Sequence, residues 1–304
     1  MRPDVFQAHE LFRVDTPALG AYGRRLLAEG DSWFTIGSLN LPRSSNILVN
    51  LDFSSRNAVV SCAYPGHTLQ HMVDCLHDPY FDRLLRQPNF ASYWEALLIS
   101  GGGNDLIDAA QVPPKDVRGR PVPVDRRLLL SPGEVAANTG IQGLERYVSE
   151  TGWARLAGYL QANFAELVLR RDQGPSRGRP LFVHTYATPV VRKSGTVGAP
   201  NGWLYPAMLT NAIPPEDWQG LATLLFERLR RLLLSLDQGS GGPNALSAVH
   251  VFDSAALPNL IPAAPESTGN SGDWINEIHL SLKGCRKLGR AMGAFVDSVL
   301  SSYP

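Results

Sequence analysis

The sequence predicts an α/β protein, a three-layer α/β/α sandwich built on a mostly parallel, five-stranded sheet. Short apolar runs rich in β-branched residues recur along the chain, and helical patterns or long polar stretches separate them. Continuous rather than alternating hydrophobicity is typical of strands that are buried on both faces of a parallel sheet. Strands that alternate with helices predict helices on both faces of that sheet.

Each predicted element follows from a local pattern. The strands are expected at 24–32, 57–63, 95–103, 180–187 and 246–253. Apolar residues at three- and four-residue steps predict the helices between and after them. These helices are expected at about 68–77, 135–149, 152–171, 215–237 and 281–300, and Ser281 is placed to cap the last one.

Two long stretches interrupt the alternation of strands and helices. They cover about 108–134 and 192–215, and neither is repetitive or of low complexity. Stretches of this length inside a compact domain are usually functional covers or insertions. We therefore expect residues 1–304 to form one domain with two insertions that wall a pocket.

Composition narrows the class of function. The 28 basic and 28 acidic residues give a net charge of zero, which removes the electrostatic argument for binding nucleic acid or an anionic membrane. No run of residues is apolar enough to span a bilayer, and no secretory signal is visible, so a cytoplasmic location is expected. Cys62, Cys75 and Cys285 lack metal-binding spacing and are expected to be free thiols. No metal or cofactor is predicted.

Polar residues follow several of the predicted strands. Ser32 follows the first strand in "GDS", Gly66 follows the second in "YPGHT", and Asn104 follows the third in "GGGND". His279, in "NEIH", follows the fifth strand after a long loop that could fold back to the same edge. Ligands of open α/β sheets bind beyond the carboxyl ends of the strands, so one pocket could collect all four residues.

Each of these motifs also has a structural interpretation. An isolated "GDS" is more often a turn or a helix cap, and "GGGND" could be a capped glycine turn. The glycines do not form a dinucleotide-binding loop, because Leu106 occupies the third glycine position of that motif. The order of the motifs, each after the appropriate strand, is what favours a shared site.

In these motifs the sequence resembles the SGNH (GDSL-type) hydrolase family. The matching residues run from Gly30 to His279 and keep the order found in that family. The resemblance implies a flavodoxin-like fold and hydrolysis of carboxylic esters through a serine intermediate. It also implies an oxyanion hole made of the backbone N–H groups of Ser32 and Gly66 and the side-chain amide of Asn104.

The proposed chemistry requires a base near the serine. His279 suits that task near neutral pH. The family usually has aspartate three residues before this histidine, and here that position is Asn276. Three alternatives remain: Asn276 orients His279, Asp273 reaches the ring from the loop, or serine and histidine act as a weak dyad. The serine-hydrolase arrangement that places its nucleophile in a G-x-S-x-G elbow is excluded, because the chain has no such motif.

Other residues near the predicted pocket have supporting roles or could contact substrate. Asp31 is expected to organise the turn at Ser32 through backbone hydrogen bonds. His184 and Tyr186 end the fourth strand, and Trp203 lies in the second insertion, so these three are candidates for substrate contact. The expected partner is a small-molecule ester or an acylated carbohydrate. An acyltransferase and a ligand-binding protein with weakened catalysis are the alternatives.

Overall fold

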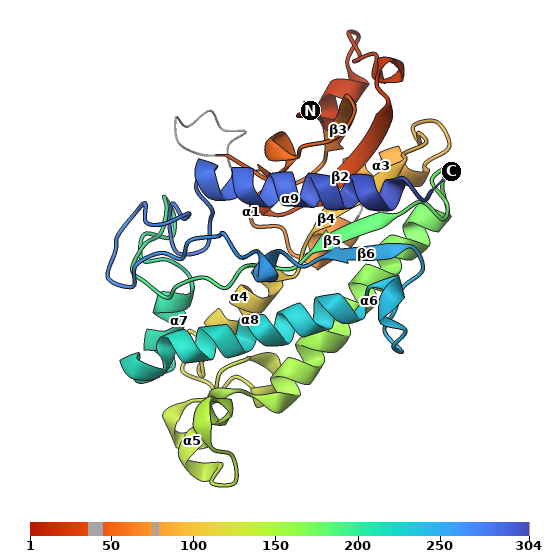
Figure 1. The fold of residues 1–304 in the computed structure, drawn as a ribbon. Helices are drawn as coiled ribbons and strands as arrows, with labels where there is room; N and C mark the ends of the chain where they lie inside the picture. Colours follow the sequence, from red (N-terminus) through yellow and green to blue (C-terminus); the bar gives the residue numbers. More distant parts are fainter. Residues whose placement is uncertain (36–44, 75, 77–78, 304) are drawn as a thin grey trace.

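The computed structural model describes residues 1–35, 45–74, 76 and 79–303 (Figure 1). Within them, six parallel strands form one sheet in the order β1-β3-β2-β4-β5-β6. The strands are β1 (Asp4–Gln7), β2 (Arg24–Gly30), β3 (Asn57–Ser61), β4 (Ala96–Ser100), β5 (Leu181–His184) and β6 (Val249–Phe252). Without β1, the order is that of a flavodoxin-like sheet. The predicted fold class is confirmed, with one strand more than expected.

The additional strand, β1, lies at the edge of the sheet. It pairs in parallel with β3, and Val5 is opposite Val59. All four residues of β1 are only partly buried, whereas all five of β3 are buried. An edge strand needs no long apolar run, which explains why the hydrophobic pattern did not reveal it.

The long helices agree with prediction better than the short ones. The α-helices are α1 (Ser32–Thr35), α2 (Leu69–Val73), α3 (Pro79–Arg86), α4 (Gly103–Gln111), α5 (Pro132–Ala137), α6 (Glu150–Asp172), α7 (Leu204–Thr210), α8 (Trp218–Ser235) and α9 (Leu282–Leu300). Helices α6, α8 and α9 match predicted ranges, and the Ser281 side chain caps α9 by accepting a hydrogen bond from Gly284 N. The predicted helix at 135–149 is wrong: α5 ends at Ala137, and a 3₁₀ turn follows at Gly143–Tyr147.

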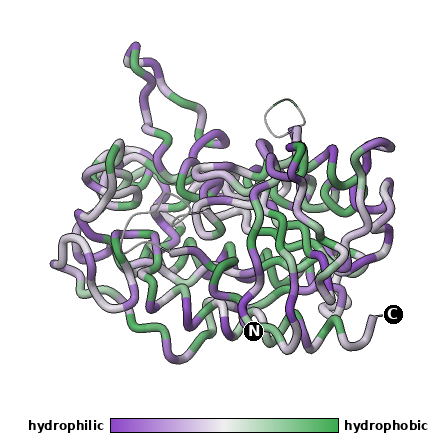
Figure 2. The backbone as a smooth tube through the Cα atoms, turned by 90° about the horizontal axis from the view of Figure 1, so that it is seen from above, coloured by the Kyte–Doolittle hydropathy of each residue, from purple (hydrophilic) through white to green (hydrophobic). Residues whose placement is uncertain are grey.

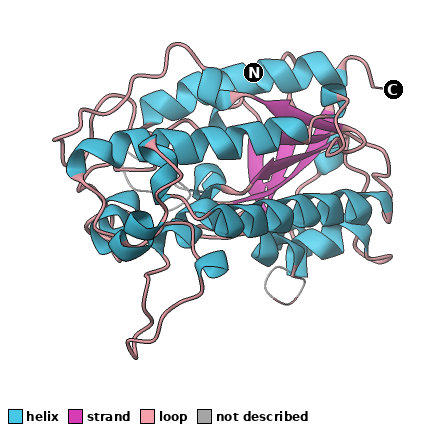
Figure 3. Ribbon diagram, turned by 90° about the horizontal axis from the view of Figure 1, so that it is seen from below, coloured by secondary structure: helices cyan, strands magenta, loops and turns pink. Residues whose placement is uncertain are grey.

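Helices cover both faces of the sheet, with α9 on one face and α6 and α8 on the other (Figures 1 and 3). Phe295 of α9 packs edge-on against Phe182 of β5, at 6.0 Å between ring centroids. Hydrophobic stretches gather in the centre of the molecule, and the outlying loops are mostly hydrophilic (Figure 2). This layered core holds the carboxyl ends of the strands rigidly at one edge.

The two expected insertions contain regular structure of their own. The stretch 108–134 includes the end of α4, a 3₁₀ turn at Val124–Arg126 and the start of α5, and 192–215 includes α7. Neither Cys62 nor Cys285 forms a disulfide among the described residues, and Cys75 lies outside them. Among the helices that the structure describes, none combines the length and apolar character needed to cross a membrane.

Candidate active site

The turn after β2 presents Ser32 at the carboxyl edge of the sheet. β2 ends at Gly30, and Ser32 begins the single helical turn α1. A Cβ atom at Gly30 would lie 2.7 Å from Ser100 Cβ on the neighbouring strand, so this position requires glycine. Asp31 N also donates to Ser100 O at 3.0 Å, which fixes the turn against β4.

Asp31 organises this turn, as expected. Its Oδ1 accepts hydrogen bonds from Trp33 N (2.9 Å) and Ser100 Oγ (2.8 Å), and its Oδ2 accepts one from the hydroxyl of Tyr186 (2.5 Å). Burial raises the pKa of Asp31 to about 6, although these hydrogen bonds favour the ionised form. Asp31 is therefore a structural acceptor beneath Ser32.

His279 lies within hydrogen-bonding distance of both Ser32 and Asn276. Its Nε2 is 2.8 Å from Ser32 Oγ, and its Nδ1 is 3.0 Å from Asn276 Oδ1. The same Oδ1 accepts backbone hydrogen bonds from Ile278 N and His279 N, which identifies it as the amide oxygen. The oxygen can only accept, so Nδ1 carries the proton and Nε2 is free to accept one from Ser32.

The imidazole is neutral in this environment. Burial alone lowers the pKa of His279 to about 3. No charged group contacts the ring among the hydrogen bonds and ion pairs of the described residues. A neutral ring with a free Nε2 is the form that a general base requires.

Asp273 does not contact His279 in the described structure. Its Oδ2 accepts hydrogen bonds from Lys287 Nζ (2.6 Å) and Ile261 N (2.7 Å). The Asp273 side chain is fully buried, and its ion pair with Lys287 joins the loop that carries His279 to α9. The alternative in which Asp273 orients the imidazole is therefore wrong: the carboxylate is engaged by a different cation.

Gly66 lies in the turn after β3, and Asn104 lies at the start of α4. Gly66 has a φ of +81°, a conformation that favours glycine, and no atom lies within 4 Å of the position where its Cβ would be. Asn104, in the first turn of α4, lines the same pocket as Ser32. Its Nδ2 donates one hydrogen bond to His67 O at 3.0 Å, which leaves a second N–H for a ligand.

The three candidate substrate contacts occupy different environments. His184 is fully buried and lies 2.9 Å from Ser100 Oγ, so the expectation that it could touch substrate is wrong. Tyr186 lines the pocket, but its hydroxyl is committed to Asp31. The Trp203 ring is partly exposed and packs edge-on against the His279 ring, at 5.1 Å between centroids.

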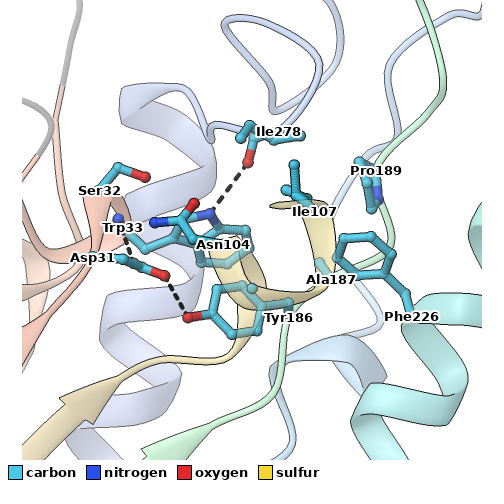
Figure 4. A pocket seen from close by; sticks show the side chains of 11 residues that line it. Asp31, Ser32, Trp33, Asn104, Ile107, Tyr186, Ala187, Pro189, Phe226 and Ile278 are labelled. Atoms are coloured by element: carbon cyan, nitrogen blue, oxygen red, sulfur yellow. Dashed lines mark hydrogen bonds between the residues drawn. The ribbon is translucent and has the colours of Figure 1, made fainter. Parts of the chain in front are cut away.

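A small pocket opens beside Ser32 (Figure 4), with a cavity volume of about 10 Å³. Its polar side is formed by the serine turn and Asn104, and its far wall is apolar. The apolar wall comprises Ile107, Ala187, Pro189, Phe226 and Ile278. These residues come from separate elements, and no local motif marks them in the sequence. Nothing among the described residues gathers three or more potential metal ligands.

Comparison with known proteins found similar solved structures at low sequence identity. No family model matches the sequence, and no curated protein matches it. Three of the solved structures similar to it are an extracellular lipase from Streptomyces rimosus, the aryl esterase of M. smegmatis and a carbohydrate acetylesterase from Sinorhizobium meliloti. Their sequence identities are 12%, 13% and 12%, with TM-scores of 0.46, 0.45 and 0.36. Each comparison covers 91% of this chain and 99% of the other.

Proposed function

We propose that this protein is a serine esterase that hydrolyses small carboxylic esters through an acyl-serine intermediate. The observation that carries the proposal is the chain of contacts from Ser32 Oγ through both nitrogens of His279 to Asn276 Oδ1. A serine hydroxyl is a weak nucleophile unless an adjacent base takes its proton. The neutral imidazole, with its Nε2 2.8 Å from Oγ, is such a base.

In the proposed acylation step, Ser32 Oγ attacks the ester carbonyl carbon while its proton passes to His279 Nε2. The backbone N–H groups of Ser32 and Gly66 and the free N–H of Asn104 are the donors assigned to the developing oxyanion. One such donor typically lowers the barrier by about 3–4 kcal/mol. His279 then returns the proton to the leaving alcohol, and water repeats the sequence to release the acid.

Asn276 has the supporting role in this mechanism. Its amide oxygen holds the proton on His279 Nδ1 and so selects the reactive tautomer, as asparagine does in Cys-His-Asn enzymes. A neutral amide stabilises the imidazolium less than a carboxylate does. We therefore expect a functional catalyst with moderate turnover.

The size of the pocket favours short acyl groups. A volume of about 10 Å³ is close to the space that one water molecule needs. An acetyl group, which adds a single methyl beyond the carbonyl, fits this space better than a longer chain. We therefore assign acetyl esters, acetylated carbohydrates included, as the substrate class to test before others.

The test is hydrolysis of a chromogenic acetate ester by the wild-type chain and by Ser32→Ala. We expect the variant to lose activity while its far-ultraviolet circular dichroism and thermal unfolding stay unchanged. Ser302→Ala, at an exposed serine near the C-terminus, is the matched control. Full activity in Ser32→Ala would disprove the serine mechanism.

Asn276 also favours a second candidate, a ligand-binding protein with weakened catalysis. A fluorophosphonate probe separates the two, because it labels an activated serine and leaves an unactivated one intact. Labelling of the wild type but not of Ser32→Ala supports the esterase. Labelling of neither protein supports the binding protein.

A further inference from the structure

Glu277 is a buried carboxylate that the proposed mechanism does not use. It directly follows Asn276 in the chain, two residues before His279, and it is 1% exposed. Its side chain accepts hydrogen bonds from four backbone N–H groups of the second insertion. The donors are Arg192 N (3.2 Å), Leu204 N (2.8 Å), Tyr205 N (2.8 Å) and Trp203 N.

These contacts determine where the Trp203 ring lies. Three of the four donors are Trp203 and the two residues after it, at the start of α7. Gly202, just before them, has a φ of +87°, and a Cβ there would lie 2.5 Å from Glu277 Oε2. The carboxylate therefore holds this backbone in an arrangement in which the Trp203 ring packs against His279.

Arg192 contacts the opposite side of the same loop. Its Nη2 donates to the backbone oxygen of Asn276 at 2.6 Å. Its Nη1 donates to Ser267 O (3.1 Å), Ser267 Oγ (3.0 Å) and Gly269 O (2.7 Å). The buried guanidinium thus fixes the backbone of the residue whose side chain orients His279.

We infer that Glu277 and Arg192 are positioning residues that couple the second insertion to the catalytic loop. Glu277 positions Trp203, and Arg192 positions Asn276. The inference rests on the proposed esterase function. Because His279 delivers the proton to the departing alcohol, the partly exposed ring beside it forms a wall for the leaving group, and a planar leaving group fits an aromatic wall.

This division of roles predicts different kinetic effects for the two residues. In Glu277→Gln one oxygen becomes an NH₂ group, which cannot accept from the backbone donors that faced it. We expect the KM for an aryl acetate to rise about tenfold with little change in kcat, as expected when a charged hydrogen-bond acceptor is lost. For ethyl acetate, which lacks a ring, we expect no comparable rise.

Arg192→Lys should give the opposite result. Lysine keeps the charge but cannot bridge Asn276 O and the 267–269 segment with a planar fork. We expect kcat to fall about tenfold with KM unchanged, because the orientation of His279 is disturbed while the wall is intact. A purely structural role would lower stability without separating KM from kcat in this way.

The experiment compares these two variants with matched controls. Glu216→Gln removes an exposed carboxylate, and Lys193→Arg alters the exposed neighbour of Arg192. Gly202→Ala tests the same contact without changing charge, and it should raise the KM for the aryl ester as Glu277→Gln does. Equal KM values for wild type, Glu277→Gln and Gly202→Ala, with an active enzyme, would overturn the inference and leave the esterase intact.

Hydrogen exchange at the amides of residues 203–205 provides a measurement that does not depend on activity. In Glu277→Gln we expect these amides to exchange at least about tenfold faster, since they lose a charged acceptor. Unchanged exchange would overturn the inference. An inactive wild type with faster exchange in the variant would refute the esterase while supporting the contacts.

Discussion

The change from Asn276 to aspartate tests the part of the mechanism that departs from the SGNH pattern. Asn276 Oδ1 lies 3.0 Å from His279 Nδ1, and the pKa of His279 is about 3. Two unit charges 3.0 Å apart interact by about 5.5 kcal/mol at an effective dielectric of about 20. At about 1.4 kcal/mol per unit, a carboxylate there would raise the imidazole pKa by at most about 4 units.

Only part of this interaction energy lowers the activation free energy of the chemical step. The amide already selects the correct tautomer, so the change adds charge stabilisation of the imidazolium and little else. The new carboxylate also loses solvation, because Asn276 is 5% exposed. We therefore expect kcat for Asn276→Asp to rise about 10- to 100-fold, which corresponds to about 1.4–2.8 kcal/mol.

The assay is the initial rate of hydrolysis of a chromogenic acetate ester across pH. In the wild type, His279 stays neutral down to about pH 3, so its protonation should not limit kcat/KM at mildly acidic pH. In Asn276→Asp the fall of kcat/KM on the acidic side of the pH–rate profile should move toward neutral pH, because the carboxylate stabilises the imidazolium.

Asp273→Asn provides the control, since it removes the nearby carboxylate that pairs with Lys287. The Asp273→Asn variant should be less stable to unfolding, with the acidic side of its pH–rate profile unchanged. The reasoning fails if a folded Asn276→Asp variant shows the wild-type profile on the acidic side and an unchanged kcat.

Three further outcomes follow from the site. Asn104→Ala should lower kcat about 10²- to 10³-fold with little change in KM, because it removes one oxyanion donor; an unchanged kcat would contradict that assignment. Phe226→Ala should raise the ratio of butanoate to acetate hydrolysis by at least about tenfold, because it enlarges the acyl pocket; an unchanged ratio would place the acyl group elsewhere. Burial raises the pKa of Asp31 from 3.8 to about 6, so the folded state holds this proton more tightly than the unfolded state. The stability that this tighter proton binding contributes is complete below about pH 4. Up to about 3 kcal/mol of it is lost as the pH rises to about 6. Relative to wild type, urea unfolding should therefore show Asp31→Asn gaining stability over that interval, and a difference independent of pH would disprove this.

The elements predicted from sequence were those whose burial leaves a continuous or periodic pattern. Five strands and the long helices α6, α8 and α9 belong to this group. The edge strand β1 and the short helices α3 and α4 do not, since few residues of each contribute to a repeating pattern. In α4 the glycines that precede Asn104 suggested a loop, and the helix begins at the last of them, Gly103.

The motif residues could be located from sequence because each follows a strand end, and strand ends meet at one edge of the sheet. The residues that contact and orient them could not be identified from sequence. The choice between Asn276 and Asp273 depended on Lys287, which lies on α9 and neutralises the aspartate. Likewise, His184 is buried beneath the turn rather than on the pocket rim, and its ring packs against Trp33 and Phe34. The position of a residue in a strand does not determine which way its side chain points.

The contact between Ser32 and His279 joins residues 247 positions apart in the chain. We expect it to form late, because it depends on the non-local pairings of the parallel sheet, which assemble slowly. During synthesis the serine turn leaves the ribosome long before its histidine, so a nascent chain would be inert toward esters. Recovery of hydrolysis after dilution from denaturant should therefore lag behind the return of helical circular dichroism, and it would report the final step of folding.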